Sequence, residues 1–126
     1  MKSPQQAIFD EVYKASLNLG YDTYHYLPPK EAQLPFVHIG EQFDQDVMTK
    51  IGVYGYVQQN INIYGHLNDR RAVSDMVNSL RHNLANLKKA EGFNINVTSI
   101  DAQMLIEDVA SDKLQRGIIE IEYRFN

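Results

Sequence analysis

The chain has 126 residues, of which 44% are hydrophobic and 22% charged, as expected for one globular domain of ~100 to 150 residues. Twelve lysines and arginines stand against 16 aspartates and glutamates, which gives a net charge of -4 and leaves no basic excess to bind nucleic-acid phosphates. The absence of cysteine excludes disulfides and thiolate chemistry, and no run approaches the ~18 apolar residues of a membrane span. We therefore expect residues 1–126 to form a single domain that binds neither nucleic acid specifically nor a membrane.

The N-terminal residues carry the signals of a helix over residues 4–19. Ser3 is a favourable N-cap, Pro4 suits the first helical position, and Gln6 is placed to reach back as in a capping box. Gly20 supplies a C-terminal stop. The apolar stripe of this helix consists of Ile8, Val12, Ala15 and Leu19.

A second helix is predicted to begin after Asn68 or Asp69 and to end at Gly92. Lys88 and Lys89 then lie at the negative end of the helix dipole. This helix has the strongest periodic signal in the chain, formed by Val73, Met76, Val77, Leu80, Leu84 and Leu87.

Two strands are predicted before the middle of the chain. Residues 21–27 are rich in aromatic and β-compatible residues and stop at two prolines, which end sheet pairing. Residues 36–43 alternate, with Val37, Ile39 and Phe43 on the same face.

The polar segment over residues 44–52 is predicted to be a loop, longer than the ~2 to 5 residues usual for a hairpin. It leads to a long strand over residues 53–64, in which odd positions are mostly aliphatic and even positions are tyrosines and amides. The aliphatic face suits a core covered by helices. An uncharged face with aromatic residues is suited to contact with another protein.

The C-terminal part of the chain predicts three more strands. Residues 93–98, extending to Ile100, alternate clearly, and residues 103–109 form a further candidate. A turn over residues 110–113 precedes a last strand over about 118–125. The predicted order is therefore α-β-β-β-α-β-β-β. This order favours an α+β domain with a mostly antiparallel, possibly mixed sheet and two helices packed on one face.

The histidines do not indicate a metal site, because none occurs in an HxxxH or HExxH pair. His25 and His38 can meet across neighbouring strands, and His66 can pair with Asp69 at a helix start, but both arrangements are generic. His82 is predicted to face solvent. We predict no metal site and no cofactor.

The sequence also lacks the marks of other catalytic centres. No serine lies in a GxSxG elbow, and the glycines at 52 and 55 lead into a strand and lack the lysine of a phosphate loop. The acidic residues fall in predicted loops or on outward faces, where a carboxyl pKa is not raised. The sequence therefore favours a protein without catalytic activity.

Four segments of the chain carry a resemblance to a known family: Tyr24-His25-Tyr26-Leu27-Pro28, Leu34-Pro35-Phe36-Val37-His38-Ile39-Gly40-Glu41, the strand over 55–64, and Arg71-Ala72-Val73-Ser74-Asp75-Met76. With these segments the chain resembles the tail terminator, or tail-to-head joining, proteins of long-tailed phages and prophages of Gram-positive bacteria. The resemblance covers nearly the whole chain in length and element order, and its motifs are structural.

The resemblance implies a non-enzymatic virion protein, assembled in the bacterial host cytoplasm. Proteins of this family form a ring, expected to be a hexamer, that caps the completed tail tube and stops its polymerisation. The implied partners are further copies of the chain, the tail tube protein and a head-completion or neck protein. A negatively charged lumen would let DNA pass without adhering to the ring.

If the chain forms such a ring, residues of the tyrosine-bearing strand face are candidates for contacts between subunits. We also expect the two arginines at the start of the second helix to pair with acidic residues nearby. The candidates are Tyr54, Tyr56, Gln58, Asn60, Tyr64, Arg70 and Arg71. The loop over residues 44–52 is a second candidate, which we expect to become ordered on meeting the tail tube.

Two other classes of function remain open. A monomeric or dimeric adaptor, such as a neck protein, predicts a small stable species with an exposed apolar patch. A small hydrolase or isomerase predicts a concave pocket that brings His25 or His38 beside a buried carboxylate.

Overall fold

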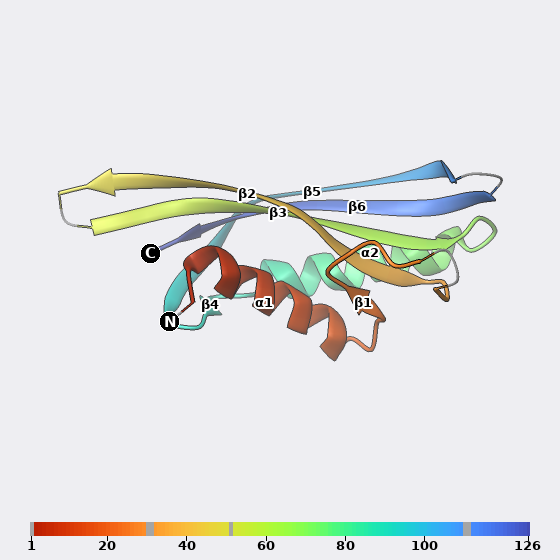
Figure 1. The fold of residues 1–126 in the computed structure, drawn as a ribbon, viewed down its shortest axis with the longest axis horizontal. Helices are drawn as coiled ribbons and strands as arrows, with labels where there is room; N and C mark the ends of the chain where they lie inside the picture. The colour runs from red at the N-terminus through yellow and green to blue at the C-terminus, as the bar shows by residue number, and fades with distance from the viewer. Residues whose placement is uncertain (1, 30–31, 51, 110–111) are drawn as a thin grey trace.

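The structure, a computed structural model, describes residues 2–29, 32–50, 52–109 and 112–126 (Figure 1). Its elements are α1 (Pro4–Asn18), β1 (Thr23–Tyr24), β2 (Phe36–Thr49), β3 (Gly52–His66), α2 (Arg70–Ala85), β4 (Lys89–Ala90), β5 (Phe93–Val109) and β6 (Asp112–Phe125). The predicted α+β class and the order α-β-β-β-α-β-β-β are confirmed.

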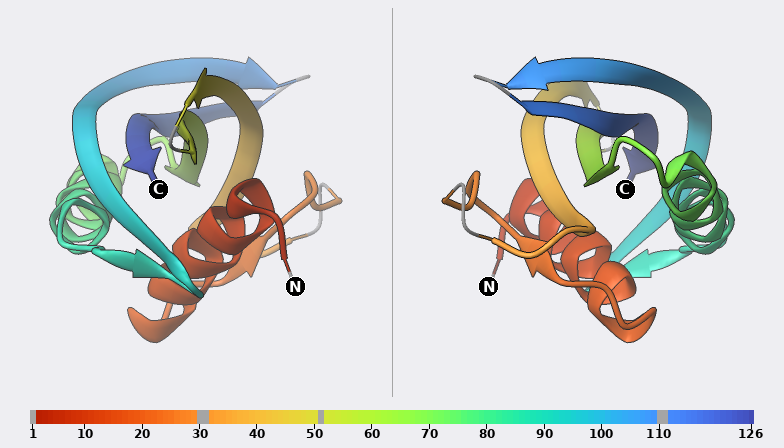
Figure 2. Two further views of the ribbon diagram at one scale, coloured as in Figure 1. Left: turned by 90° about the vertical axis from the view of Figure 1, so that its left-hand side faces the viewer. Right: turned by 90° about the vertical axis from the view of Figure 1, so that its right-hand side faces the viewer.

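The strands form one six-stranded sheet in the order β1-β2-β3-β6-β5-β4, which is strongly twisted when seen from its ends (Figure 2). Only β1 and β2 pair in parallel. From either edge inward, the sheet has a two-residue strand followed by the two strands of a long hairpin, because each half of the chain consists of a helix, a two-residue strand and a long hairpin. The halves join along β3 and β6, where Ile61 pairs with Ile119.

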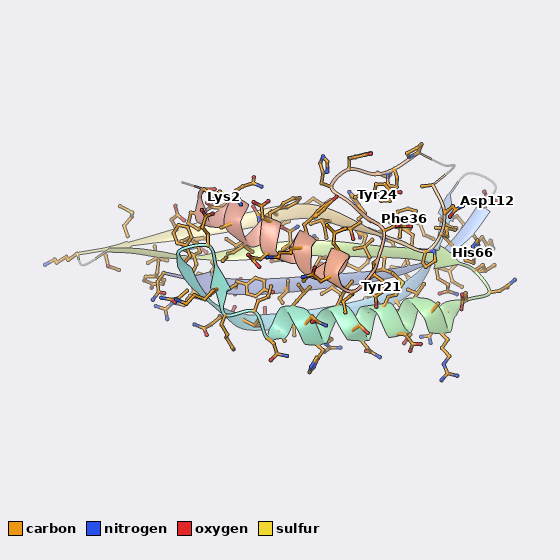
Figure 3. The ribbon with its side chains drawn as sticks, turned by 90° about the horizontal axis from the view of Figure 1, so that it is seen from below. Lys2, Tyr21, Tyr24, Phe36, His66 and Asp112 are labelled. Carbon is orange, nitrogen blue, oxygen red and sulfur yellow. The ribbon has the colours of Figure 1, made fainter. Side chains whose placement is uncertain are left out.

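Both helices lie side by side on one face of the sheet (Figure 3), which we call the helix face. The opposite side is called the open face. Apolar side chains on the helix face form the core with the helices, as the alternating patterns predicted. Its buried strand members are Val37, Ile39, Val57, Ile61, Ile63, Ile95, Ile119, Ile121, Tyr123 and Phe125.

Two glycines let α2 approach the sheet closely. A Cβ atom at Gly117 would lie 2.6 Å from Cγ2 of Val77, and one at Gly65 would overlap the side chain of Val73. Real Cβ contacts of this length do not occur, so a larger residue at either position must displace the helix or its side chains.

The predicted start and stop of α1 are confirmed. The Ser3 side chain accepts a hydrogen bond from the backbone N–H of Gln6 at 3.1 Å, and Gly20 has a φ of 86°. The capping box is wrong in one respect, because the side chain of Gln6 donates to Asp10 Oδ1 at 2.8 Å.

The second helix begins as predicted, with Asp69 as its N-cap, but it ends at Ala85 and not at Gly92. The hydroxyl of Tyr123 donates to the carbonyl of Leu84 at 2.6 Å, which satisfies a group that the helix end leaves free. Lys89 is therefore not in the last helical turn and belongs to β4.

The predicted loop over residues 44–52 is wrong, because β2 continues to Thr49 and pairs with β3 throughout. A bulge between Ile39 and Gln42 shifts the register and reverses the alternation after it. Phe43 therefore lies on the open face, 58% exposed, and not beside Val37 as predicted.

The strands at the two ends of the chain differ in length from the predictions. The first strand is only Thr23–Tyr24. The two strands predicted over 93–100 and 103–109 are one strand, β5, which pairs with β6 along its length. Of the predicted turn, residues 112 and 113 begin β6, and residues 110 and 111 lie outside the described residues.

The two long hairpins extend to opposite ends of the molecule (Figure 1). The outer end of the β2–β3 hairpin, residues 47–50 and 52–54, projects past the helices and is called the arm. Next to it, Asp44 and Asp46 occupy positions on the helix face that are apolar nearer the middle of the sheet. Both side chains are exposed, and Asp44 Oδ2 accepts a hydrogen bond from Gln5 Nε2 of α1 at 2.9 Å.

Replacing Gly117 with alanine is expected to lower the free energy of unfolding by about 1–3 kcal/mol, because the new methyl group overpacks the contact between α2 and the sheet. Gly92→Ala is the matched control, since a Cβ there has no neighbour within 4 Å. Urea unfolding followed by circular dichroism measures both. Equal stability of the two variants would contradict the close approach of α2.

Candidate interaction surface

The structure divides the predicted interface residues between the two sides of the sheet. Five of them project from β3 toward the open face, alternating with the buried residues of the core. These are Tyr54, Tyr56, Gln58, Asn60 and Tyr64. Arg70 and Arg71 are exposed in the first turn of α2, on the helix side. The seven residues therefore do not form one continuous patch.

Tyr64 is the most enclosed of the five residues on β3, with 8% of its surface exposed. Its ring lies 5.2 Å from that of Phe36, and the Arg116 guanidinium lies 5.7 Å from the ring centre. Burial raises the pKa of the Tyr64 hydroxyl. Little of this side chain is available to a partner, and its place in an interface stays a prediction.

Arg116 ties three strands together on the open face. Its Nε and Nη2 donate to Asn62 Oδ1 at 3.2 and 2.8 Å, and its Nη1 donates to Glu107 Oε1 at 3.0 Å. Asn62 Nδ2 in turn lies 3.4 Å from Nδ1 of His38, whose pKa is lowered by burial. Sequence reasoning missed this network, because cross-strand pairs such as Tyr64 with Arg116 require the strand order.

The other end of the β3 row is more open to solvent. Tyr54 and Tyr56 are half-buried, their rings are 6.2 Å apart, and the Arg124 guanidinium lies 4.4 Å from the centre of the Tyr54 ring. This group presents aromatic surface and a positive charge together, a combination that is enriched where proteins meet.

The middle of the open face is acidic. Glu120 of β6 pairs directly with Asp101 of β5, and Glu122 follows on the same face. Nearby, Asn60 Nδ2 donates to Glu41 Oε2 at 3.1 Å, which lowers the pKa of that carboxyl. Like charges opposite one another destabilise a sheet, so this pair does not stabilise the isolated chain.

The flank formed by α2 and β4 has the opposite charge. Residues 70–89 hold five of the chain's 12 lysines and arginines and one of its 16 acidic residues. In the part of the chain that the structure describes, neither Arg70 nor Arg71 forms an ion pair. Their predicted acidic partners are therefore not found among the described residues of the same subunit.

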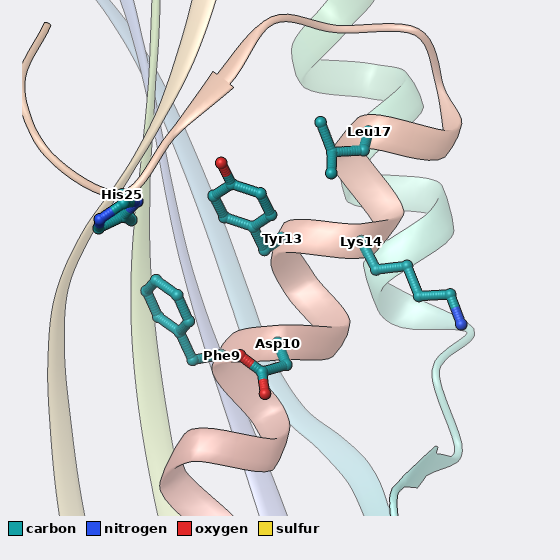
Figure 4. Close-up of a pocket in the computed structure, with 6 residues that line it drawn as sticks. All are labelled: Phe9, Asp10, Tyr13, Lys14, Leu17 and His25. Atoms are coloured by element: carbon teal, nitrogen blue, oxygen red, sulfur yellow. The ribbon is translucent and has the colours of Figure 1, made fainter.

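A shallow groove of about 360 Å³ lies along α1 and includes His25 (Figure 4). Phe9 and Tyr13 point toward His25 in this groove, whereas Lys14 points away. The carboxylate of Asp10 is not buried, and a hydrogen bond from Lys2 at 2.7 Å lowers its pKa. A general acid is most effective when its pKa lies near the operating pH, so Asp10 does not supply the buried carboxylate expected beside His25.

Within residues 2–29, 32–50, 52–109 and 112–126, no group of three or more histidines, aspartates or glutamates is placed to hold a metal ion. Neither of the described helices has the length and apolarity to cross a membrane.

The fold is similar to that of a chain in the virion of a native gene transfer agent particle, with a TM-score of 0.69. The two chains share 13% sequence identity over 98% of this chain and 94% of that chain. The type 4 fimbrial biogenesis protein PilO from Pseudomonas aeruginosa aligns over 98% of this chain and 73% of its own at 12% identity, but its TM-score of 0.43 is too low to indicate a shared fold. No protein-family model and no curated protein sequence matches the chain.

Replacing Arg116 with alanine is expected to lower the free energy of unfolding by about 1–2 kcal/mol, because Asn62 and Glu107 lose a partly buried charged donor. Arg124→Ala is the control, since it removes one exposed contact with an aromatic ring worth about 0.5–1 kcal/mol. Urea unfolding of both variants gives the comparison. A larger loss for Arg124→Ala would contradict the role assigned to Arg116.

Proposed function

We propose that the chain is a structural subunit of a phage-like particle and that it acts as a tail terminator. Several copies form a ring, expected to be hexameric, which caps the tail tube, ends its polymerisation and offers a surface to a head-completion or neck protein. The observation that carries this proposal is the similarity, over 98% of this chain, to the fold of a chain in the gene transfer agent virion. The tail-terminator role itself comes from the sequence resemblance.

The shape of the molecule supports a ring. Its two sheet edges differ in sequence, so a contact between the β2 edge of one copy and the β5 edge of the next joins unlike surfaces. Repeated contacts of that kind close into rings when the rotation between copies allows it. The acidic centre of the open face, with Asp101, Glu120 and Glu122, suits a lumen through which DNA passes without adhering.

The site geometry favours this function over catalysis. The groove beside His25 lacks a buried carboxylate. The open face presents tyrosines, amides and charged groups spread along β3 and β6, as in surfaces that bind proteins. Residues 1–126 are proposed to act as one unit in this role, in the virion and without a cofactor.

The direct test measures the length of tail tubes grown with and without the protein. The purified chain is added to polymerising tail tube protein from the same particle, and tube lengths are measured by electron microscopy. A ring that caps tubes shortens them and is seen at one end. Tubes of unchanged length with bare ends would contradict the tail role.

The tyrosine pair provides a variant for the same test. Tyr54→Ala with Tyr56→Ala is expected to weaken association between copies about tenfold or more, because aromatic side chains dominate many interfaces. Tyr26→Ala is the control, since it removes a tyrosine that is 53% exposed on the segment after β1 and not on β3. Light scattering across a range of concentrations measures the shift. Unchanged mass of the double variant would contradict its place in the interface.

A further inference from the structure

Both outer edges of the sheet carry a long stretch of backbone without a partner among the described residues. β1 pairs with β2 only at Val37 and His38, which leaves residues 42–49 open. At the other edge, β4 pairs with β5 only at Phe93 and Asn94, and Ile95 N bonds to the Lys88 carbonyl, which leaves residues 97–109 open. Each edge is a template for pairing with another strand.

Two of the features that usually prevent such pairing are missing from both edges. The two stretches contain no proline and no lysine, residues with which proteins commonly block exposed edges, although each strand has a bulge and acidic side chains. They also expose large apolar side chains, with Phe43 58%, Met48 78% and Ile106 58% exposed. Edges of this length and character are expected to be covered in the assembled protein.

The directions of the two edges are compatible. β2, β3, β6 and β5 alternate in direction across the sheet, so β2 and β5 run antiparallel. When the β5 edge of a second copy is placed against β2 with both helix faces on the same side, the pair is antiparallel and the sheet continues unbroken. The same step can then be repeated at the free edge of every copy.

One cation lies beside the β5 edge, although the open stretch of β5 itself carries Asp101, Glu107 and Asp108. On the helix face, the β2 edge carries Asp44 and Asp46. The β5 edge lies beside a groove lined by Arg70, Met104 and Ile106. A copy docked at this edge would bring its carboxylates to the arginine side chain, which has no ion pair within its own subunit among the described residues.

We propose that subunits join edge to edge, with β2 of one copy paired antiparallel to β5 of the next, Phe43 opposite Leu105 and Asp44 opposite Met104. This register aligns the centres of the open stretches 42–49 and 97–109. It places Phe43 and Leu105 together on the open face, and Asp44 and Asp46 near Arg70 on the helix face. The inference rests on the proposed ring, for which it supplies the contact between subunits.

The register also has the stagger that a closed sheet needs. Within one subunit, the pairing through Val57 and Tyr123 brings Asp44 level with Val97. Met104 is level with Gly117 of β6, six residues from Tyr123 because of the bulge after Val97. Pairing Asp44 with Met104 thus displaces each copy by ~20 Å, while four long strands span ~19 Å of sheet width. The resulting strand tilt of ~46° is close to the 35–45° of closed barrels.

A cysteine pair tests the register directly, because the chain contains no cysteine. Gln45 and Gln103 are exposed, lie on opposite edges of one subunit and face each other across the proposed contact. The double variant Gln45→Cys, Gln103→Cys is oxidised and separated on a non-reducing gel. We expect a ladder of disulfide-linked species that ends at the ring. The control is Gln45→Cys with Ser99→Cys, on the same face but four residues out of register.

The outcomes separate this inference from the proposed function. A ladder at least tenfold stronger for the first variant than for the control supports the contact, provided that circular dichroism shows both variants folded. No ladder, or equal ladders, overturns it. If tubes are capped without a ladder, the tail role stands and the edge contact is wrong. If the ladder forms but tubes grow unchecked, the contact stands and the tail role is wrong.

Discussion

The sheet is much longer than the helices that cover it, and most features of the molecule depend on this difference. β5 has 17 residues and spans ~56 Å, whereas α2 has 16 residues and spans ~24 Å. The helices therefore bury only the middle of the sheet. Beyond them, the arm is a two-stranded ribbon, and such a ribbon is marginally stable on its own. Only another molecule can bury what the chain leaves uncovered.

This difference also explains which elements the sequence predicted well. β3 and α2 pack on each other, so their apolar residues recur at periods of two and of 3.6. β3 was predicted nearly in full, and the start of α2 was predicted correctly although its end was placed too late. The arm lies beyond the helices, so residues such as Met48 there follow no burial pattern. The bulge after Ile39 could not be predicted either, because one inserted residue moves the following side chains to the opposite face of the sheet without changing the composition of the strand.

Only part of the candidate surface was predictable, because alternation along one strand can be seen in a sequence whereas contacts between strands cannot. The row from Tyr54 to Asn60 follows from alternation along one strand, which a sequence displays. The contacts of Arg116 with Asn62 and Glu107 join three strands, and a sequence gives no strand order. The separation of Arg70 from the tyrosine row likewise depends on which face of the sheet α2 covers.

The two-part construction of the sheet has a consequence for how the chain folds. Each half forms its long hairpin from neighbouring residues, and such local contacts form quickly. The junction of β3 with β6 joins residues as far apart as Ile61 and Ile119, so it carries a larger loop-closure cost. The rate of folding is thus expected to be limited by the docking of two preformed halves. The pairing of β3 with β6 then joins these halves into one cooperative unit.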